Sequence, residues 1–119
     1  MSEFPFEVKV IDGVTVAKLL ANPTLSHLKE LVAHIAKGFP RERRLWDLSQ
    51  IDFNVPYHDI IKLAQHKKKV FSEPCKVAFV VQDSLSYGQV NQFRAHREDE
   101  NCSVMPFQSE DEAMAWLKA

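Results

Sequence analysis

The sequence is poor in the residues that build phosphate-binding loops and metal sites. Only three glycines, Gly13, Gly38 and Gly88, occur in 119 residues, which excludes a glycine-rich loop that cradles phosphates. The two cysteines, Cys75 and Cys102, form no C-x-x-C pair and have no histidines at metal-ligand spacing nearby. We therefore expect core thiols in a reducing compartment, with no resident metal and no cofactor.

Neither the charge balance nor the hydropathy indicates nucleic acid or a membrane span. The chain carries 15 basic and 16 acidic residues, so its net charge of −1 produces no field that would attract a polyanion. The first ten residues, MSEFPFEVKV, lack the basic segment and apolar stretch of a signal peptide, and no run of about 18 apolar residues follows. We expect a soluble cytoplasmic protein that binds any charged partner through a local patch.

The length and composition predict one globular domain over residues 1–119. Hydrophobic residues make up 45% of the chain and charged residues 26%, which is a globular balance rather than a disordered one. A chain of this length can bury one sizeable core without disulfides.

The first half of the chain predicts a hairpin, a helix and a third strand. Alternating valines flank Asp12-Gly13, the strongest short-range signal for a two-stranded antiparallel hairpin. Residues 22–38 place apolar side chains at helical spacing, with Asn-Pro-Thr before them and Gly38 at the end. After the loop 39–43, RRLWDLS, residues 43–49, is expected to be the third strand.

The second half alternates helices with strands. The segment 57–71 has one apolar helical face and 76–82 reads as a strand buried on both faces. A third helix is predicted over 84–98 and an edge strand over 102–107, because Pro106 cannot donate to a central ladder. Ser109 and Glu112 form a capping-box sequence that opens the last helix.

The predicted order is β-β-α-β-α-β-α-β-α. An antiparallel hairpin followed by alternating units indicates an α/β fold with one mixed sheet, whose later strands run parallel, and about four helices packed on it.

This order and three sequence motifs resemble the SpoIIAA-like, or STAS-like, bacterial domains over nearly the whole chain. The motifs are DLSxxxF (Asp47, Leu48, Ser49, Phe53), VAFVVQDSLSYG (Val77 to Gly88) and FxSxxEAxxWL (Phe107, Ser109, Glu112, Ala113, Trp116, Leu117).

The resemblance implies a small non-enzymatic regulatory module that acts by binding another protein or a second copy of itself. In the anti-sigma-factor antagonists of this fold, a serine at the start of the second helix is phosphorylated by a partner kinase. Here Asn54-Val55-Pro56-Tyr57-His58 replaces the turn that carries this serine, and Ser49 lies too early in the loop to take its place. The chain is therefore expected to lack the usual phospho-acceptor.

A second resemblance, to SpoIIAA-like proteins likened to SEC14 or CRAL-TRIO lipid carriers, implies an apolar or lipid-like ligand between helices and sheet. The second helix could then contact an anionic membrane or partner through a basic patch, although cations there also complement the helix dipole. The patch consists of Lys62, Lys67, Lys68 and Lys69.

The loops after the third and fourth strands hold the candidate ligand or partner contacts. Asp47 and Asp83 lie near the carboxyl ends of predicted parallel strands, where open α/β sheets bind ligands, so they could converge as an acid–base pair or metal site. Alternatively, Asp83 or Ser84 caps the third helix and Asp47 accepts hydrogen bonds from loop amides. The full set of candidate contacts is Asp47, Ser49, Tyr57, His58, Asp83, Ser84, Ser86 and Tyr87.

Three hypotheses follow from the sequence. The first is a STAS-like binding module without catalytic residues, the second is a lipid-like ligand carrier with a basic lid, and the third is an enzyme that uses Asp47 and Asp83. Cys75 and Cys102 begin neighbouring predicted strands, and a disulfide between them would require close Cα atoms, which the expected reducing compartment disfavours.

Overall fold

The computed structural model describes residues 4–40 and 42–119, so Arg41, in the loop before the third strand, lies outside the described residues. The strands are β1 (Phe6–Ile11), β2 (Val14–Leu19), β3 (Arg43–Asp47), β4 (Cys75–Val80) and β5 (Cys102–Phe107). The helices are α1 (Leu25–Gly38), α2 (Tyr57–Val70), α3 (Ser84–Arg97) and α4 (Glu110–Lys118).

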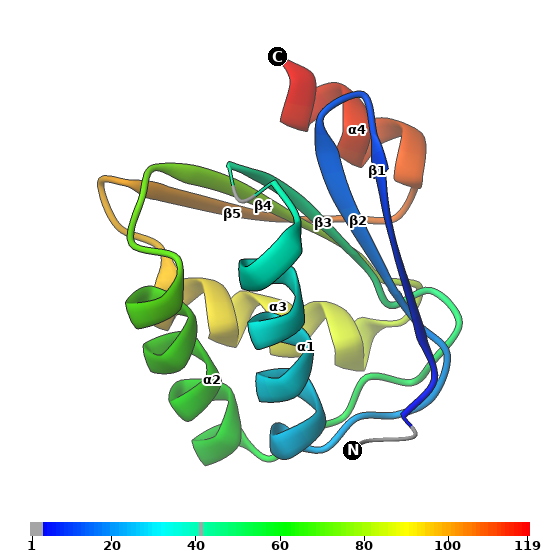
Figure 1. Ribbon diagram of the computed structural model, residues 1–119. Coiled ribbons are helices and arrows are strands. Elements are labelled where there is room, and N and C mark those ends of the chain that lie inside the picture. Colours follow the sequence, from blue (N-terminus) through cyan, green and yellow to red (C-terminus); the bar gives the residue numbers. More distant parts are fainter. Residues whose placement is uncertain (1–3, 41) are drawn as a thin grey trace.

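The strands form one sheet in the order β1-β2-β3-β4-β5 (Figure 1). Only β1 and β2 are antiparallel, and the other three pairings are parallel. Helices α1, α2 and α3 cover one face of the sheet, and α4 covers the other (Figure 1). The predicted order of helices and strands along the chain, the mixed sheet and the four helices are confirmed.

The hairpin turns where the sequence predicts it. Asp12 has φ of 52° and Gly13 has φ of 79°. A turn with positive φ at both central residues matches the right-handed twist of the flanking strands, and glycine adopts that conformation without steric cost. The register that follows pairs Ile11 with Val14 and Phe6 with Leu19.

Side-chain oxygens cap three of the helices. Thr24 accepts from the backbone N–H of His27, whose ring accepts from the N–H of Thr24 in return. Asp83 opens α3, and the predicted cap Ser109 opens α4 by accepting from Glu112. At α2 the cap position is Pro56, which provides no side-chain hydrogen bond.

Alternation along the central strands divides the core into two layers. Trp46 and Phe79 face α1, α2 and α3, while Leu45 and Val80 face α4. Successive side chains in a strand point to opposite faces, so Asp47 follows Leu45 onto the α4 face. This placement separates Asp47 from the helices on the other side.

The edge strands also follow the sequence. Strand β5 ends the sheet with Pro106 in it, and β4 beside it is buried on both faces, as predicted.

Strand β3 ends at Asp47 rather than Ser49, and Phe71 lies just after α2 rather than within it. Trp116 is half-buried against Phe107, whereas Ala113 and Leu117 are fully buried.

Candidate functional site

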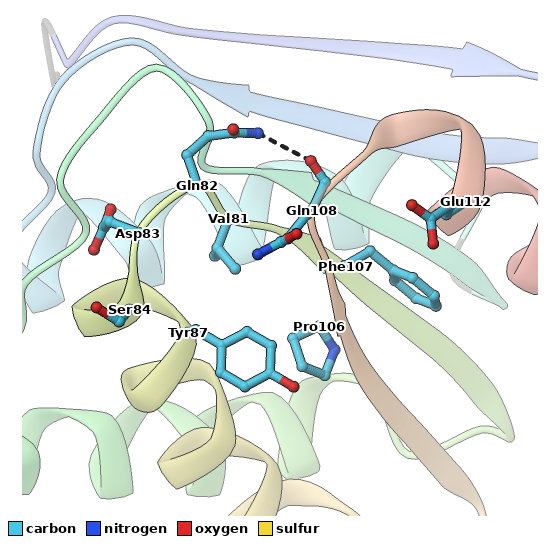
Figure 2. Close-up of a pocket in the computed structure, with 9 residues that line it drawn as sticks. All are labelled: Val81, Gln82, Asp83, Ser84, Tyr87, Pro106, Phe107, Gln108 and Glu112. Atoms are coloured by element: carbon cyan, nitrogen blue, oxygen red, sulfur yellow. Dashed lines mark hydrogen bonds between the residues drawn. The ribbon is translucent and has the colours of Figure 1, made fainter.

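A surface pocket of about 480 Å3 opens at the carboxyl ends of β4 and β5, beside the first turns of α3 and α4. Figure 2 shows Tyr87, Pro106 and Phe107 along one side of it and the amides of Gln82 and Gln108 along the other. The Gln82 side chain donates to the carbonyl of Gln108 over 3.0 Å, which joins the two strand ends. We call this the β4–β5 pocket; its lining is completed by Val81, Asp83, Ser84 and Glu112.

Three predicted contact residues, Asp83, Ser84 and Tyr87, line the β4–β5 pocket. The sequence reasoning missed the contribution of β5 and α4, which supply Phe107 and Glu112. Their signal was the strand order, because parallel neighbours bring their carboxyl ends to the same edge of a sheet.

Asp83 performs the capping role considered for it. Its carboxylate accepts from the backbone N–H of Ser86 at 2.8 Å and from the Ser86 hydroxyl at 3.0 Å. These backbone and side-chain hydrogen bonds lower the pKa of Asp83 below its ordinary value. The carboxylate is therefore charged at neutral pH, at the mouth of the pocket.

The prediction that Ser86 contacts a ligand or partner is wrong. Its side chain is fully buried, and its hydroxyl accepts from the backbone N–H of Phe53 at 3.0 Å. Gln89, one turn later, accepts from the N–H of Val55 at 2.8 Å and donates to the side chain of Asn54. Helix α3 thus holds residues 53–55, within the segment that replaces the phospho-acceptor turn.

Asp47 and Asp83 do not converge, so the geometry expected for an acid–base pair is absent. Asp47 lines a separate pocket of about 70 Å3 on the α4 face, together with Glu110. It accepts from the backbone N–H and the hydroxyl of Ser49, as the capping alternative predicted. The two carboxylates line different pockets, Asp83 at the carboxyl ends of β4 and β5 and Asp47 on the α4 face of β3.

Tyr57 and His58 lie at the start of α2 rather than in the β4–β5 pocket. The Tyr57 hydroxyl is 2.8 Å from Nε2 of His96, near the carboxyl end of α3. His58 lies 3.4 Å from the carboxylate of Asp59. These predicted contacts form a second exposed surface, away from Tyr87.

The predicted basic patch loses its central member. Lys62, Lys68 and Lys69 are exposed, but Lys67 is 2% exposed and its amine lies 4.0 Å from the ring centroid of Trp46. The reason is helical period, since Lys67 continues the inward positions of Ile60, Leu63 and Ala64. The helical spacing by itself predicts a buried side chain at position 67, whereas the charge of lysine favours an exposed one.

The exposed lysines of α2 are joined by a basic neighbour from α1. Partial burial lowers the pKa of His66, and the positive charges of Lys29, Lys69 and Lys67 lower it further. Lys29 belongs to α1, so the basic surface spans two helices.

Within residues 4–40 and 42–119, no group of three or more His, Cys, Asp or Glu side chains is placed to hold a metal ion. In the same ranges, none of the helices has the length and apolar composition needed to span a bilayer.

A search of solved structures places the fold. The chain superposes on an uncharacterized DUF3478-family protein with a SpoIIAA-like fold from Shewanella loihica PV-4, with a TM-score of 0.61. The match covers 95% of this chain and 92% of the other at 18% sequence identity, a level that supports a shared fold alone. No protein-family model and no curated protein matched the chain. The polypeptide therefore has the SpoIIAA-like, or STAS-like, fold that its sequence predicts.

Proposed function

We propose that this chain is a non-enzymatic cytoplasmic binding module that recognises a segment of a partner protein in the β4–β5 pocket. The observation that carries this proposal is an open, half-apolar pocket next to two exposed apolar side chains, Leu85 and Tyr87, which are 54% and 45% exposed. Ligand sites in open α/β sheets occupy this position, outside the carboxyl ends of parallel strands.

The lining favours a partner segment that joins a cation to an apolar residue. Asp83 and Glu112 contribute two carboxylates, and among the residues that the structure describes no lysine, arginine or histidine lines the β4–β5 pocket. Tyr87 and Phe107 provide aromatic surface that can cover an apolar side chain or the face of a guanidinium. An arginine or lysine beside a leucine or aromatic residue fits both properties.

Photo-crosslinking in the native host tests this assignment. Benzoylphenylalanine in place of Tyr87 is expected to form a covalent adduct with one partner, or with a second copy of this chain. The matched control places the same residue at Tyr57, which is also a helix-terminal tyrosine and is 51% exposed. An adduct from position 57 alone, or none from position 87, would contradict the pocket as the contact surface.

A second measurement tests whether the pocket charges contribute to binding of the crosslinked partner. Adding Glu112→Lys to the position-87 variant is expected to abolish the adduct by reversing one of the two pocket charges, while circular dichroism stays unchanged. An adduct of undiminished yield would show that the charge complementarity plays no part.

Attraction to an anionic membrane is the second candidate, because lysines from both α1 and α2 contribute to the basic surface around His66. An internal lipid ligand has less support, since Ile60, Leu63 and Lys67 fill the space between α2 and the sheet. The apolar face of α2 is also in the core, so binding would depend on charge alone.

Vesicle flotation checks this second candidate. Changing Lys62, Lys68 and Lys69 to glutamate should reduce binding to phosphatidylserine vesicles by tenfold or more, because each surface lysine contributes about 1 kcal/mol. A control variant with glutamate at Lys9, Lys37 and Lys118, also exposed, should bind more strongly than the α2 variant. Equal, negligible binding by the parent, the α2 variant and the control variant would exclude an anionic membrane as the binding partner.

A further inference from the structure

Two thiols meet at the opposite end of the sheet from the β4–β5 pocket. Cys75 and Cys102 are direct partners in the parallel register of β4 and β5, and their sulfur atoms lie 3.3 Å apart in a hydrogen bond. Adjacent strands are about 4.8 Å apart, which falls within the Cα separations that disulfides span, about 4.4 to 6.8 Å. Both cysteines are free thiols.

Two buried arginines approach the sulfur of Cys75. Nη2 of Arg44 lies 3.7 Å from it and Nη2 of Arg97 lies 3.8 Å from it. Arg44 is 1% exposed and Arg97 is 2% exposed, so little water screens their charges. Arg97 also donates to the carbonyl of Phe71 at 2.9 Å, which fixes the guanidinium in place.

The two sulfurs are electrostatically different. The hydrogen bond between the two sulfurs, followed by the charges of Arg44 and Arg97, lowers the pKa of Cys75 to about 6, against the opposing effect of its burial. The same hydrogen bond, together with burial, raises the pKa of Cys102 above its ordinary value. Of the two sulfurs, Cys75 is therefore the one that the surroundings favour as a thiolate.

A small opening reaches Cys102, one member of this pair, from solvent. Cys102 and Arg97 line a pocket of about 90 Å3 that lies between the end of α2, the end of α3 and the start of β5. Cys75 itself is 9% exposed. A peroxide can approach through such an opening, whereas bulky reagents are excluded.

We propose that Cys75 and Cys102 form a peroxide-reactive dithiol site, in which Cys75 is the attacking sulfur and Cys102 the resolving one. The observation that supports this proposal is the arrangement of two register-paired thiols beside two buried guanidinium groups. This site is independent of the β4–β5 pocket, which lies at the other end of the strands.

The reaction balances with hydrogen peroxide as the oxidant. The Cys75 thiolate attacks one peroxide oxygen, so an S–O bond forms, the O–O bond breaks and the departing hydroxide is protonated to water. The Cys102 sulfur then attacks the Cys75 sulfenic acid, forming the S–S bond, while the leaving hydroxyl takes the Cys102 proton as a second water. Two thiols lose two electrons and two protons, and the peroxide is reduced to two waters.

Intact-mass spectrometry of the reduced full-length protein after peroxide treatment tests the proposal. The folded monomer should lose the mass of two hydrogens, and peptide mapping should join Cys75 to Cys102. In Cys102→Ser, unfolding the peroxide-treated protein in the presence of dimedone is expected to label a sulfenic acid at Cys75, whereas Cys75→Ser should leave Cys102 unmodified. Unchanged mass under conditions that oxidise free cysteine, or disulfides only between molecules, would overturn the proposal.

The pH dependence of the oxidation rate distinguishes this site from an ordinary buried thiol pair. It can be measured on the unmutated protein. The charged groups that face the pair are Arg44 of β3, Lys67 of α2 and Arg97 of α3. The oxidation rate should reach half of its maximum near pH 6, the pKa of Cys75. A half-maximum near the pKa of a free thiol, about 8.5, would refute the role of the arginines.

Discussion

Replacing Lys67 by methionine is expected to stabilise the protein at neutral pH by about 1 to 4 kcal/mol. The amine is fully buried among the rings of Trp46, Phe79 and Phe93, at 4.0, 5.4 and 5.1 Å from their centroids. Methionine has a similar length and makes favourable contacts with aromatic rings. It would keep the packing and remove the cost of burying an amine.

Two opposing effects decide the charge of Lys67. Cation–π contacts favour the ammonium form by about 2 kcal/mol, whereas removing an ion from water costs several kcal/mol. Burial comes first, followed by repulsion from Arg44 and Arg97, and together they hold the pKa of Lys67 well below its ordinary value of 10.5. Desolvation wins, so we infer that burying the charged form of Lys67 costs stability.

The sign of the pH dependence follows from this inference. Between the lowered pKa of folded Lys67 and 10.5, the unfolded chain binds a proton at Lys67 that the folded chain does not, which penalises folding. The penalty shrinks as the pH rises toward 10.5, so the advantage of Lys67→Met over the parent should be larger at about pH 6 than at about pH 9.

Urea unfolding monitored by circular dichroism measures these differences. Lys67→Glu should destabilise the protein by about 3 kcal/mol or more, since it buries a carboxyl group in the same apolar site. Lys68→Met and Lys68→Glu are matched controls on the exposed side of α2 and should change stability by about 0.5 kcal/mol or less. A loss of stability in Lys67→Met would show that the amine is charged and stabilised by its aromatic cage.

Replacing Gln89 by leucine or Ser86 by alanine should destabilise the protein by about 1 to 3 kcal/mol each. Gln89 accepts from the buried N–H of Val55, and Ser86 accepts from the buried N–H of Phe53. Either substitution leaves a donor without an acceptor inside the protein. The loss should appear as faster amide hydrogen exchange at Val55 or Phe53, and as a lower urea midpoint.

The controls for this pair lie on the exposed side of the same helix. Gln92→Leu and Ser84→Ala repeat the chemical changes at exposed positions, so their expected effect is about 0.5 kcal/mol or less. In a double-mutant cycle, Ser86→Ala and Gln89→Leu should not be additive, because both side chains hold one short segment. Exchange rates at Val55 that stay at the parent value would mean that Gln89 does not protect this amide.

Much of the fold was predictable because its signals act over a few residues. Asp12-Gly13 sets a turn, Ser109 caps a helix through the next turn, and the apolar run of β4 identifies a strand covered on both faces. These local choices together specify the order of elements, and the order limits the sheet to few topologies.

The candidate site was only partly predictable, because residue type concealed positions that the period had indicated. In α3, Gln89, Val90, Phe93 and Arg97 follow an inward helical spacing that includes Ser86, whereas the polarity of serine favours an exposed contact. In α2, the spacing of Ile60 and Leu63 indicates burial of Lys67, whereas its charge favours the surface. At both positions the helical period indicates burial more directly than the residue type does.

The sequence by itself determined the hairpin, the caps of α1 and α4 and the order of helices and strands along the chain, since each depends on neighbours within one or two turns of chain. Only the tertiary structure decided that Asp47 and Asp83 line different pockets and that Arg44 and Arg97 approach Cys75. Such encounters join residues dozens of positions apart. They depend on how each helix is rotated against the sheet, and that rotation is fixed by packing of the whole core.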